Sequence, residues 1–135
     1  MKSSFNHIQI NIDFKNASFY RELFTFMGWS LIFEGEGMMG FKSGKNGDIW
    51  FINSMKQVQT DYEQMGMNHL SIGVKEQLNV DEVVSFLATK KINALFETPR
   101  HRPEFSQGDD QTYYQVMFTS PDNILFEVVY VGLKN

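Results

Sequence analysis

The sequence predicts an α+β fold made of two similar β-α-β-β-β modules. The clearest observation is a repeat, because the segment Phe5–Ile10 recurs as Met67–Ile72 with Asn-His at the same place in both. A second echo, Leu31–Glu34 with Ala94–Glu97, follows at nearly the same spacing. In both halves a helix-like stretch lies between the two echoes. The preserved order indicates duplication of a unit of about half the chain.

The first half begins with residues 5–12, where polar and apolar side chains alternate as in a strand with one buried side. Residues 16–27 carry apolar side chains at helical spacing, and Gly28 is placed to end that helix. A turn-forming cluster at 43–47 separates the last two of the strands that follow. We expect three such strands, at 30–34, 37–42 and 48–53.

The second half repeats this scheme with a strand at 67–74 and a helix at 80–91, for which Asn79 is the candidate N-cap. Residues 98–111 are charged and rich in turn formers, and a loop of this length is either a binding loop or a solvated excursion. The other predicted strands are 93–97, 112–119 and 123–131. The expected organisation is therefore one domain over 1–135, with module 1 at about 1–54, a linker at 55–66 and module 2 at about 67–135.

Composition excludes several classes of function. With 135 residues the chain can bury a core without metals or disulfides, and the absence of cysteine removes thiolate catalysis and Cys-ligated zinc. A net charge of −4 without a basic cluster argues against nucleic acid as a partner. No segment resembles a signal peptide or a membrane span, so a cytoplasmic protein is expected.

Three side chains are candidates for a metal site. His7 and His69 hold equivalent places in the repeated strands, each on the face opposite the aliphatic side. Glu127 is a carboxylate flanked by apolar residues on its own face of the last strand, where it needs a partner. Two imidazoles and a carboxylate suit a divalent Fe, Mn, Co, Ni or Zn ion. A hydrogen-bonded or solvent-facing role remains the alternative for each.

Three further residues are weaker candidates for catalysis. His101 lies between two arginines in the segment 98–111, where it could transfer protons or help to bind an anionic substrate, although a solvated loop is the simpler interpretation. Tyr113 and Tyr114 open a strand on opposite faces, so one of them could hydrogen-bond a ligand while the other packs in the core.

The ordered motifs resemble the vicinal oxygen chelate superfamily, which contains glyoxalases, bleomycin-resistance proteins and extradiol dioxygenases. The resemblance covers nearly the whole chain. It is carried by His7–Ile10, Ser18–Tyr20 with Met27–Trp29, His69–Ile72, Tyr113-Tyr114 and Pro121–Glu127. It implies that the paired modules form a partly closed mixed barrel with the helices outside. It also implies metal ligands at His7, His69 and Glu127, a small-molecule cup and a homodimer.

Within that resemblance the cup is expected to be lined by Gln9, Trp50, Ser71 and Met117. Trp50 stands where glyoxalase-type lyases place a further glutamate, and Met117 stands where extradiol dioxygenases place a tyrosine. The resemblance thus favours a metal-dependent enzyme of the lyase, isomerase or dioxygenase type that is not an authentic glyoxalase I. The alternative is a metal-free protein that sequesters a small molecule, as bleomycin-resistance proteins do.

Overall fold

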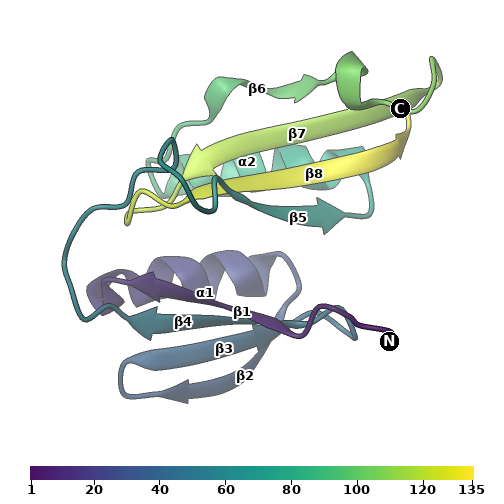
Figure 1. The fold of residues 1–135 in the computed structure, drawn as a ribbon. Helices are drawn as coiled ribbons and strands as arrows, with labels where there is room; N and C mark the ends of the chain where they lie inside the picture. Colours follow the sequence, from purple (N-terminus) through teal and green to yellow (C-terminus); the bar gives the residue numbers. More distant parts are fainter. The chain divides into compact units, whose positions relative to one another are not determined.

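Each half of the chain folds into the β-α-β-β-β order that the repeat predicts. The structure is a computed structural model that describes residues 1–135, and the chain divides into two units, Met1–Gln59 and Thr60–Asn135. Each unit is a four-stranded mixed sheet with one α-helix, as Figure 1 shows. The predicted α+β fold of two such modules is confirmed.

The sheet of the first unit has the strand order β1-β4-β3-β2. β1 runs parallel to β4, and the other neighbours are antiparallel. The first strand in the sequence therefore lies at one edge and pairs with the last strand of its module. The elements are β1 (His7–Ile12), the 3-10 helix η1 (Phe14–Asn16), α1 (Ala17–Phe26), β2 (Ser30–Gly35), β3 (Met38–Lys42) and β4 (Asp48–Asn53).

The second unit repeats this topology with the order β5-β8-β7-β6. β5 is again parallel to the last strand, β8, and the remaining pairs are antiparallel. The elements are β5 (Leu70–Val74), α2 (Gln77–Thr89), β6 (Leu95–His101), the 3-10 helix η2 (Pro103–Phe105), β7 (Gln111–Thr119) and β8 (Leu125–Leu133). No helix in either unit has the length and apolarity that a membrane crossing needs.

The core of the first unit lies between α1 and its sheet. Tyr20, Leu23 and Phe24 are fully buried, and their spacing of three and four residues puts them on one side of the helix. The ring of Phe24 packs against Phe41 and Phe51 at centroid distances of 5.5 and 5.2 Å. This contact fixes which face of the first sheet is buried by α1.

The second unit is packed in the same way. Val80, Val83 and Leu87 form the buried side of α2. Under it, Phe118 of β7 and Phe126 of β8 are buried and stack at 5.7 Å. In both units the α-helix therefore covers one face of the sheet, and no helix of the unit covers the other face.

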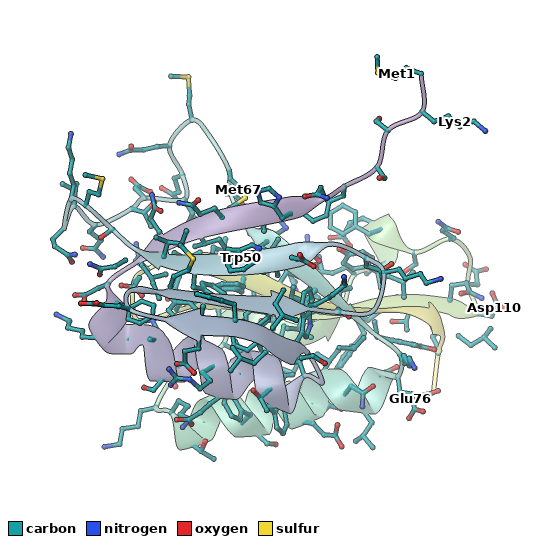
Figure 2. The ribbon with its side chains drawn as sticks, turned by 90° about the horizontal axis from the view of Figure 1, so that it is seen from below. Met1, Lys2, Trp50, Met67, Glu76 and Asp110 are labelled. Atoms are coloured by element: carbon teal, nitrogen blue, oxygen red, sulfur yellow. The ribbon has the colours of Figure 1, made fainter.

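The ends of the helices agree with the sequence in one case and differ in the other. α1 stops just before Gly28, which has a φ of +83°, as predicted for a glycine after a helix. α2, however, begins at Gln77 and not at Val80. Asn79 is not the N-cap, because it lies in the first turn, where its Oδ1 accepts from the N–H of Glu76 at 3.1 Å. Glu76, which Figure 2 labels, occupies the capping position, and a capping box between Glu76 and Asn79 starts the helix.

The prediction of a loop over 98–111 is wrong in its first part. β6 continues to His101 after an irregularity at 96–97, where φ is +57° and +59°. There the hydroxyl of Thr98 accepts from the N–H of Met117 at 2.9 Å and replaces a backbone partner in the ladder. The turn-forming composition hid a bulged edge strand, because a side chain supplies the hydrogen bond that the backbone lacks.

Candidate functional site

Glu127 of β8 lies on the sheet face that points away from α2. Its neighbours along the strand, Phe126 and Val128, are buried on the helix side. The register places Glu127 between Ser71 of β5 and Met117 of β7. The residue is only 3% exposed, and a buried carboxylate is costly unless its oxygens have partners.

Both carboxylate oxygens of Glu127 have such partners. The hydroxyl of Tyr113 donates to Oε1 at 2.8 Å. Oε2 lies 3.3 Å from Nε2 of His69. The second unit therefore brings two of the three predicted ligand residues together and adds Tyr113 to them.

Tyr113 acts as a hydrogen-bond donor in this cluster. Burial raises the pKa of Tyr113 to about 12, and the bond to Glu127 acts in the same direction. The side chain is consequently a neutral phenol near pH 7, and a phenol with this pKa is a donor and not a base. Phe105 of η2 packs edge-on against its ring at 5.4 Å, so the orientation of the phenol is fixed from both sides.

His69 has a partner on each ring nitrogen. Nε2 faces Glu127, and Nδ1 lies 2.7 Å from Oδ1 of Asn68. Asn68 is in turn fixed, because its Nδ2 donates to the backbone carbonyl of Tyr62 at 2.9 Å. The imidazole is thus oriented by a sequence of contacts that starts in the segment before β5.

His7 lies in the first unit, on β1, and is exposed. Its Nδ1 is 2.7 Å from Oδ1 of Asn6, the same contact that His69 makes with Asn68. Gln9 follows His7 on the same face of the strand and pairs in register with Trp50 of β4. Within neither unit do three His, Asp or Glu side chains form a metal-binding group.

Trp50 lies on the face of the first sheet opposite to α1, since its neighbours Ile49 and Phe51 are buried on the helix side. A Cβ atom on Gly40 of β3 would come within 2.8 to 2.9 Å of three ring atoms of Trp50. The indole therefore rests directly on the backbone of β3. Phe33 of β2 pairs with Gly40 on its other side, so Trp50, Gly40 and Phe33 form a row across three strands, and the ring centroid of Phe33 lies 5.9 Å from that of the indole. Figure 2 labels Trp50 on this sheet.

The remaining candidates have structural partners of their own. Nδ1 of His101 lies 2.6 Å from the hydroxyl of Thr112. Tyr114 is on the helix side of β7, and its hydroxyl donates to Asp81 of α2 at 2.8 Å. Burial and this hydrogen bond raise the pKa of Tyr114 to about 12. Tyr114 therefore connects α2 to the sheet and is remote from the Glu127 face.

The arginines beside His101 are paired with acids. Arg102 lies 2.6 Å from Glu104, and Arg100 lies 3.8 Å from Glu97. The guanidinium of Arg102 also lies over the ring of Phe105, 4.9 Å from its centroid. Both guanidinium groups therefore already face a carboxylate, and that of Arg102 lies against η2.

The sequence had signalled only part of this cluster. Tyr113 was one of two adjacent tyrosines, and nothing in the sequence distinguished it from Tyr114 as the partner of Glu127. Asn6 and Asn68 were visible in the repeat, but only the structure shows that each contacts the histidine that follows it. The recurrence of Asn-His as a pair was the signal available for this contact.

Comparison with solved structures shows which known fold the chain has. Structures that match nearly the whole chain are glyoxalase, bleomycin-resistance and dioxygenase superfamily proteins, and the chain has the fold of that superfamily. No protein-family model matches the sequence, and no curated protein matches it significantly. The similarity is therefore one of fold at low sequence identity.

Three neighbours illustrate this similarity. A candidate glyoxalase from Bacillus halodurans is 23% identical, with a TM-score of 0.75 over 93% of this chain and 94% of that one. A glyoxylase/bleomycin resistance protein/dioxygenase domain from Frankia sp. EAN1pec is 17% identical, with a TM-score of 0.66 over 97% and 98%. A lactoylglutathione lyase from Agrobacterium tumefaciens is 17% identical, with a TM-score of 0.62 over 96% and 92%.

Proposed function

We propose that this chain is a divalent-metal-dependent enzyme that acts on a small molecule with two adjacent oxygen atoms, as a lyase, isomerase or dioxygenase. His7, His69 and Glu127 are the proposed ligands. Fe, Mn, Co, Ni and Zn are the candidate ions, because imidazole and carboxylate together suit them. A fold of this kind hosts several functions, so the proposal depends on the site and not on the fold.

The observation that carries the proposal is the 3.3 Å distance between Nε2 of His69 and Oε2 of Glu127. Two ligand atoms that are each about 2.0 to 2.2 Å from one ion, at tetrahedral or octahedral angles, lie about 2.8 to 3.6 Å apart. Oε1 of Glu127 is engaged by Tyr113 and Nδ1 of His69 by Asn68. The two atoms that remain for an ion are the two that face each other, and outer contacts of this kind are typical of metal ligands.

A proton held between His69 and Glu127 accounts for the same distance. In that case the pair is an ordinary ion pair, with a buried carboxylate and a partly exposed imidazole, and binds no metal. The two interpretations differ in one measurable property, since a metal site takes up an added ion and an ion pair does not.

When bound, a divalent ion supplies Lewis-acid stabilisation of negative charge on a substrate oxygen. The side chains around it provide orientation. Tyr113 holds the Glu127 carboxylate, and the buried Met117 and Val129 give this face an apolar surface. Ser71, beside Glu127 in the register, is exposed and offers a hydroxyl to substrate. In the first unit Gln9 offers an amide next to Trp50.

Two residues restrict the choice of reaction. Trp50 has no carboxylate, so we do not expect glyoxalase I activity on a glutathione adduct. Met117 has no acidic proton, so it cannot serve as the tyrosine of an extradiol dioxygenase. A proton-transferring base is not assigned, because the histidine beside Glu127 is itself a proposed ligand and no further carboxylate or histidine contacts Glu127.

The test is elemental analysis after incubation with each of the five metal salts and removal of free ion. We expect wild-type protein to retain about one equivalent of one of these ions. His7→Ala, His69→Ala and Glu127→Gln should lose it, and His101→Ala is the matched control that should keep it. Failure of the wild type to retain any of the five ions contradicts the proposal. Retention by all three ligand variants contradicts the ligand assignment.

A second function is favoured by the row of Phe33, Gly40 and Trp50. Its two rings lie on a sheet face that no helix of the unit covers, and Phe33 is 47% exposed. Such a surface can take up a flat apolar molecule without any metal. Saturable binding of an anilinonaphthalene dye in the presence of a chelator, abolished by Trp50→Ala, would support a sequestering protein. Unchanged dye binding in that variant would exclude this row as the binding surface.

The homodimer implied by the superfamily remains a prediction. Leu31, Ile32 and Phe33 make the edge strand β2 apolar and are 42%, 45% and 47% exposed. An exposed apolar edge of this kind is typical of strands that associate. Sedimentation velocity at several protein concentrations tests the dimer, and a single monomeric species throughout contradicts it.

A further inference from the structure

The same hydrogen bond occurs on both predicted histidine ligands. In each unit an asparagine immediately before the histidine places its side-chain Oδ1 2.7 Å from Nδ1 of that histidine. The two pairs, Asn6-His7 and Asn68-His69, precede or open the edge strands β1 and β5, which are equivalent in the two topologies. Because the Asn–His contact occurs in both modules, we infer that it has a role in orienting the histidines.

The contact determines where the imidazole proton lies. The Oδ1 atom of asparagine only accepts hydrogen bonds, so the nitrogen that faces it must carry the hydrogen. With the proton on Nδ1, a neutral imidazole has its lone pair on Nε2. For His69 this is the nitrogen that faces Oε2 of Glu127.

In the second unit the orientation of the amide is itself fixed. Nδ2 of Asn68 donates to the carbonyl of Tyr62 at 2.9 Å. Rotating the amide by half a turn would oppose two carbonyl oxygens at Tyr62 and would leave Nδ2 without its acceptor there, so the observed orientation, with Oδ1 towards His69, is the one that satisfies the Tyr62 carbonyl. The backbone carbonyl of Tyr62, six residues before Asn68, therefore determines that Oδ1 of Asn68 is the atom that faces His69.

Two contacts hold the segment that contains Tyr62 against the strands of its own unit. Nδ2 of Asn123, in the turn before β8, donates to the carbonyl of Thr60 at 2.9 Å. The ring of Tyr62 packs edge-on against Phe96 of β6 at 6.5 Å. Residues 60–62 of the predicted linker thus help to hold the side chain of Asn68 in place.

We propose that Asn6 and Asn68 are positioning residues that fix the Nδ1–H tautomer and the ring orientation of His7 and His69. Asn68 has the larger effect, because it alone is braced by Tyr62 and because Glu127 competes for the proton of His69. A carboxylate favours a hydrogen on the nitrogen that it faces, which is Nε2. Asn68 opposes this preference and keeps Nε2 available as a ligand.

This inference deepens the proposed metal function, but its first test needs no metal. The measurement is a two-bond ¹H–¹⁵N correlation spectrum of the imidazoles at a pH above about 8, where histidine is ordinarily neutral. We expect Nδ1–H tautomers for His7 and His69 in the wild type. Asn68→Leu should convert His69 to the Nε2–H tautomer, because Glu127 is then its one acceptor. A wild-type His69 that carries its hydrogen on Nε2, or on both nitrogens, overturns the proposal.

The matched variants separate positioning from general damage. Asn6→Leu should alter the tautomer of His7 alone. Asn11 lies on the same face of β1 as His7, but its side chain bonds to Gln9 at 3.0 Å, so Asn11→Leu should alter the tautomer of neither histidine. Asn68→Asp keeps an acceptor for Nδ1 and should restore the Nδ1–H tautomer that Asn68→Leu loses. A tautomer that is the same in Asn68→Leu and in wild type contradicts the assignment.

The second readout is calorimetric titration with Co²⁺ alone. Loss of an outer hydrogen bond to a ligating histidine usually weakens metal binding about 10- to 100-fold, and we expect this for Asn68→Leu. Equal affinity in Asn68→Leu and wild type overturns the positioning role for metal. If the wild type binds none of the five ions, the metal proposal fails, while the tautomer spectra still decide whether the asparagines position the histidines.

Discussion

The two units place different side chains at equivalent positions of the same strand lattice. In the first, the row across β1, β4, β3 and β2 is Gln9, Trp50, Gly40 and Phe33. In the second, the row across β5, β8 and β7 is Ser71, Glu127 and Met117. Each row lies two residues beyond the histidine of its unit. The position of Trp50 in one unit is therefore the position of Glu127 in the other.

The different side chains have different requirements, and each unit meets its own. A buried carboxylate needs polar partners, and the second unit supplies Tyr113 and His69. An indole needs space, and the first unit supplies Gly40, which has no side chain to obstruct the ring. We infer that the second unit carries the acid and the first carries an apolar surface, while the Asn-His pair common to both is retained.

The largest effect on metal affinity should come from replacing Glu127, with Trp50, at the equivalent position of the other row, as the comparison. Glu127→Gln removes the negative charge that a cation requires, so we expect metal affinity to fall by more than about 100-fold, beyond the range for outer contacts. Trp50→Phe keeps an apolar ring and removes no charge, so its affinity should stay close to that of wild type. Calorimetric titration with Co²⁺ measures both. Comparable losses in the two variants would show that the division of tasks between the rows is wrong.

The next effect concerns stability in the first unit. Gly40→Ala places a Cβ atom within 2.8 to 2.9 Å of the Trp50 ring, and overpacking of this kind costs about 1 to 3 kcal/mol of unfolding free energy. Gly73→Ala in β5 is the matched control, because nothing lies within 4 Å of the added atom. Urea denaturation followed by far-ultraviolet circular dichroism, which reports on both units, compares the two. Equal stability of both variants would mean that the indole does not rest on Gly40.

A smaller effect is expected from removing one hydroxyl near Glu127. Tyr113→Phe deletes the donor to Oε1 and should weaken Co²⁺ binding by about 10-fold, at the lower end of the range for outer contacts. Tyr114→Phe removes an adjacent hydroxyl that bonds to Asp81 on the other sheet face, so its affinity should match wild type. A loss in Tyr114→Phe as large as that in Tyr113→Phe would show that the effect does not arise from the contact with Glu127.

The sequence was sufficient for the parts that depend on periodicity. Alternation and helical spacing located the strands and α1, and the Asn-His repeat revealed the two modules. It was insufficient where a side chain substitutes for a backbone group. Thr98 continues β6 through a bulge, and Asn79 closes the first turn of α2 from inside. Neither role can be inferred from residue type, because each depends on a partner in the folded chain.

The same reasoning applies to the candidate site. His7, His69 and Glu127 were proposed from their places in the strands, and the structure places His69 beside Glu127. The choice between Tyr113 and Tyr114 required the three-dimensional structure, because adjacent strand residues point to opposite faces and the sequence does not say which face is the core.

The smallest predicted effect is the pH dependence of the Tyr114 contact. Burial and the bond to Asp81 raise the pKa of Tyr114 from 10.0 to about 12. The folded state thus binds this proton more tightly than the unfolded state, so the contribution to stability is complete below pH 10 and is lost as the pH rises towards 12. In Tyr114→Phe, absorbance titration at alkaline pH should show one fewer phenol that titrates late. Urea denaturation at each pH should show that this variant loses less stability at alkaline pH than wild type does. An alkaline profile identical to wild type would mean that Tyr114 does not link α2 to its sheet through this bond.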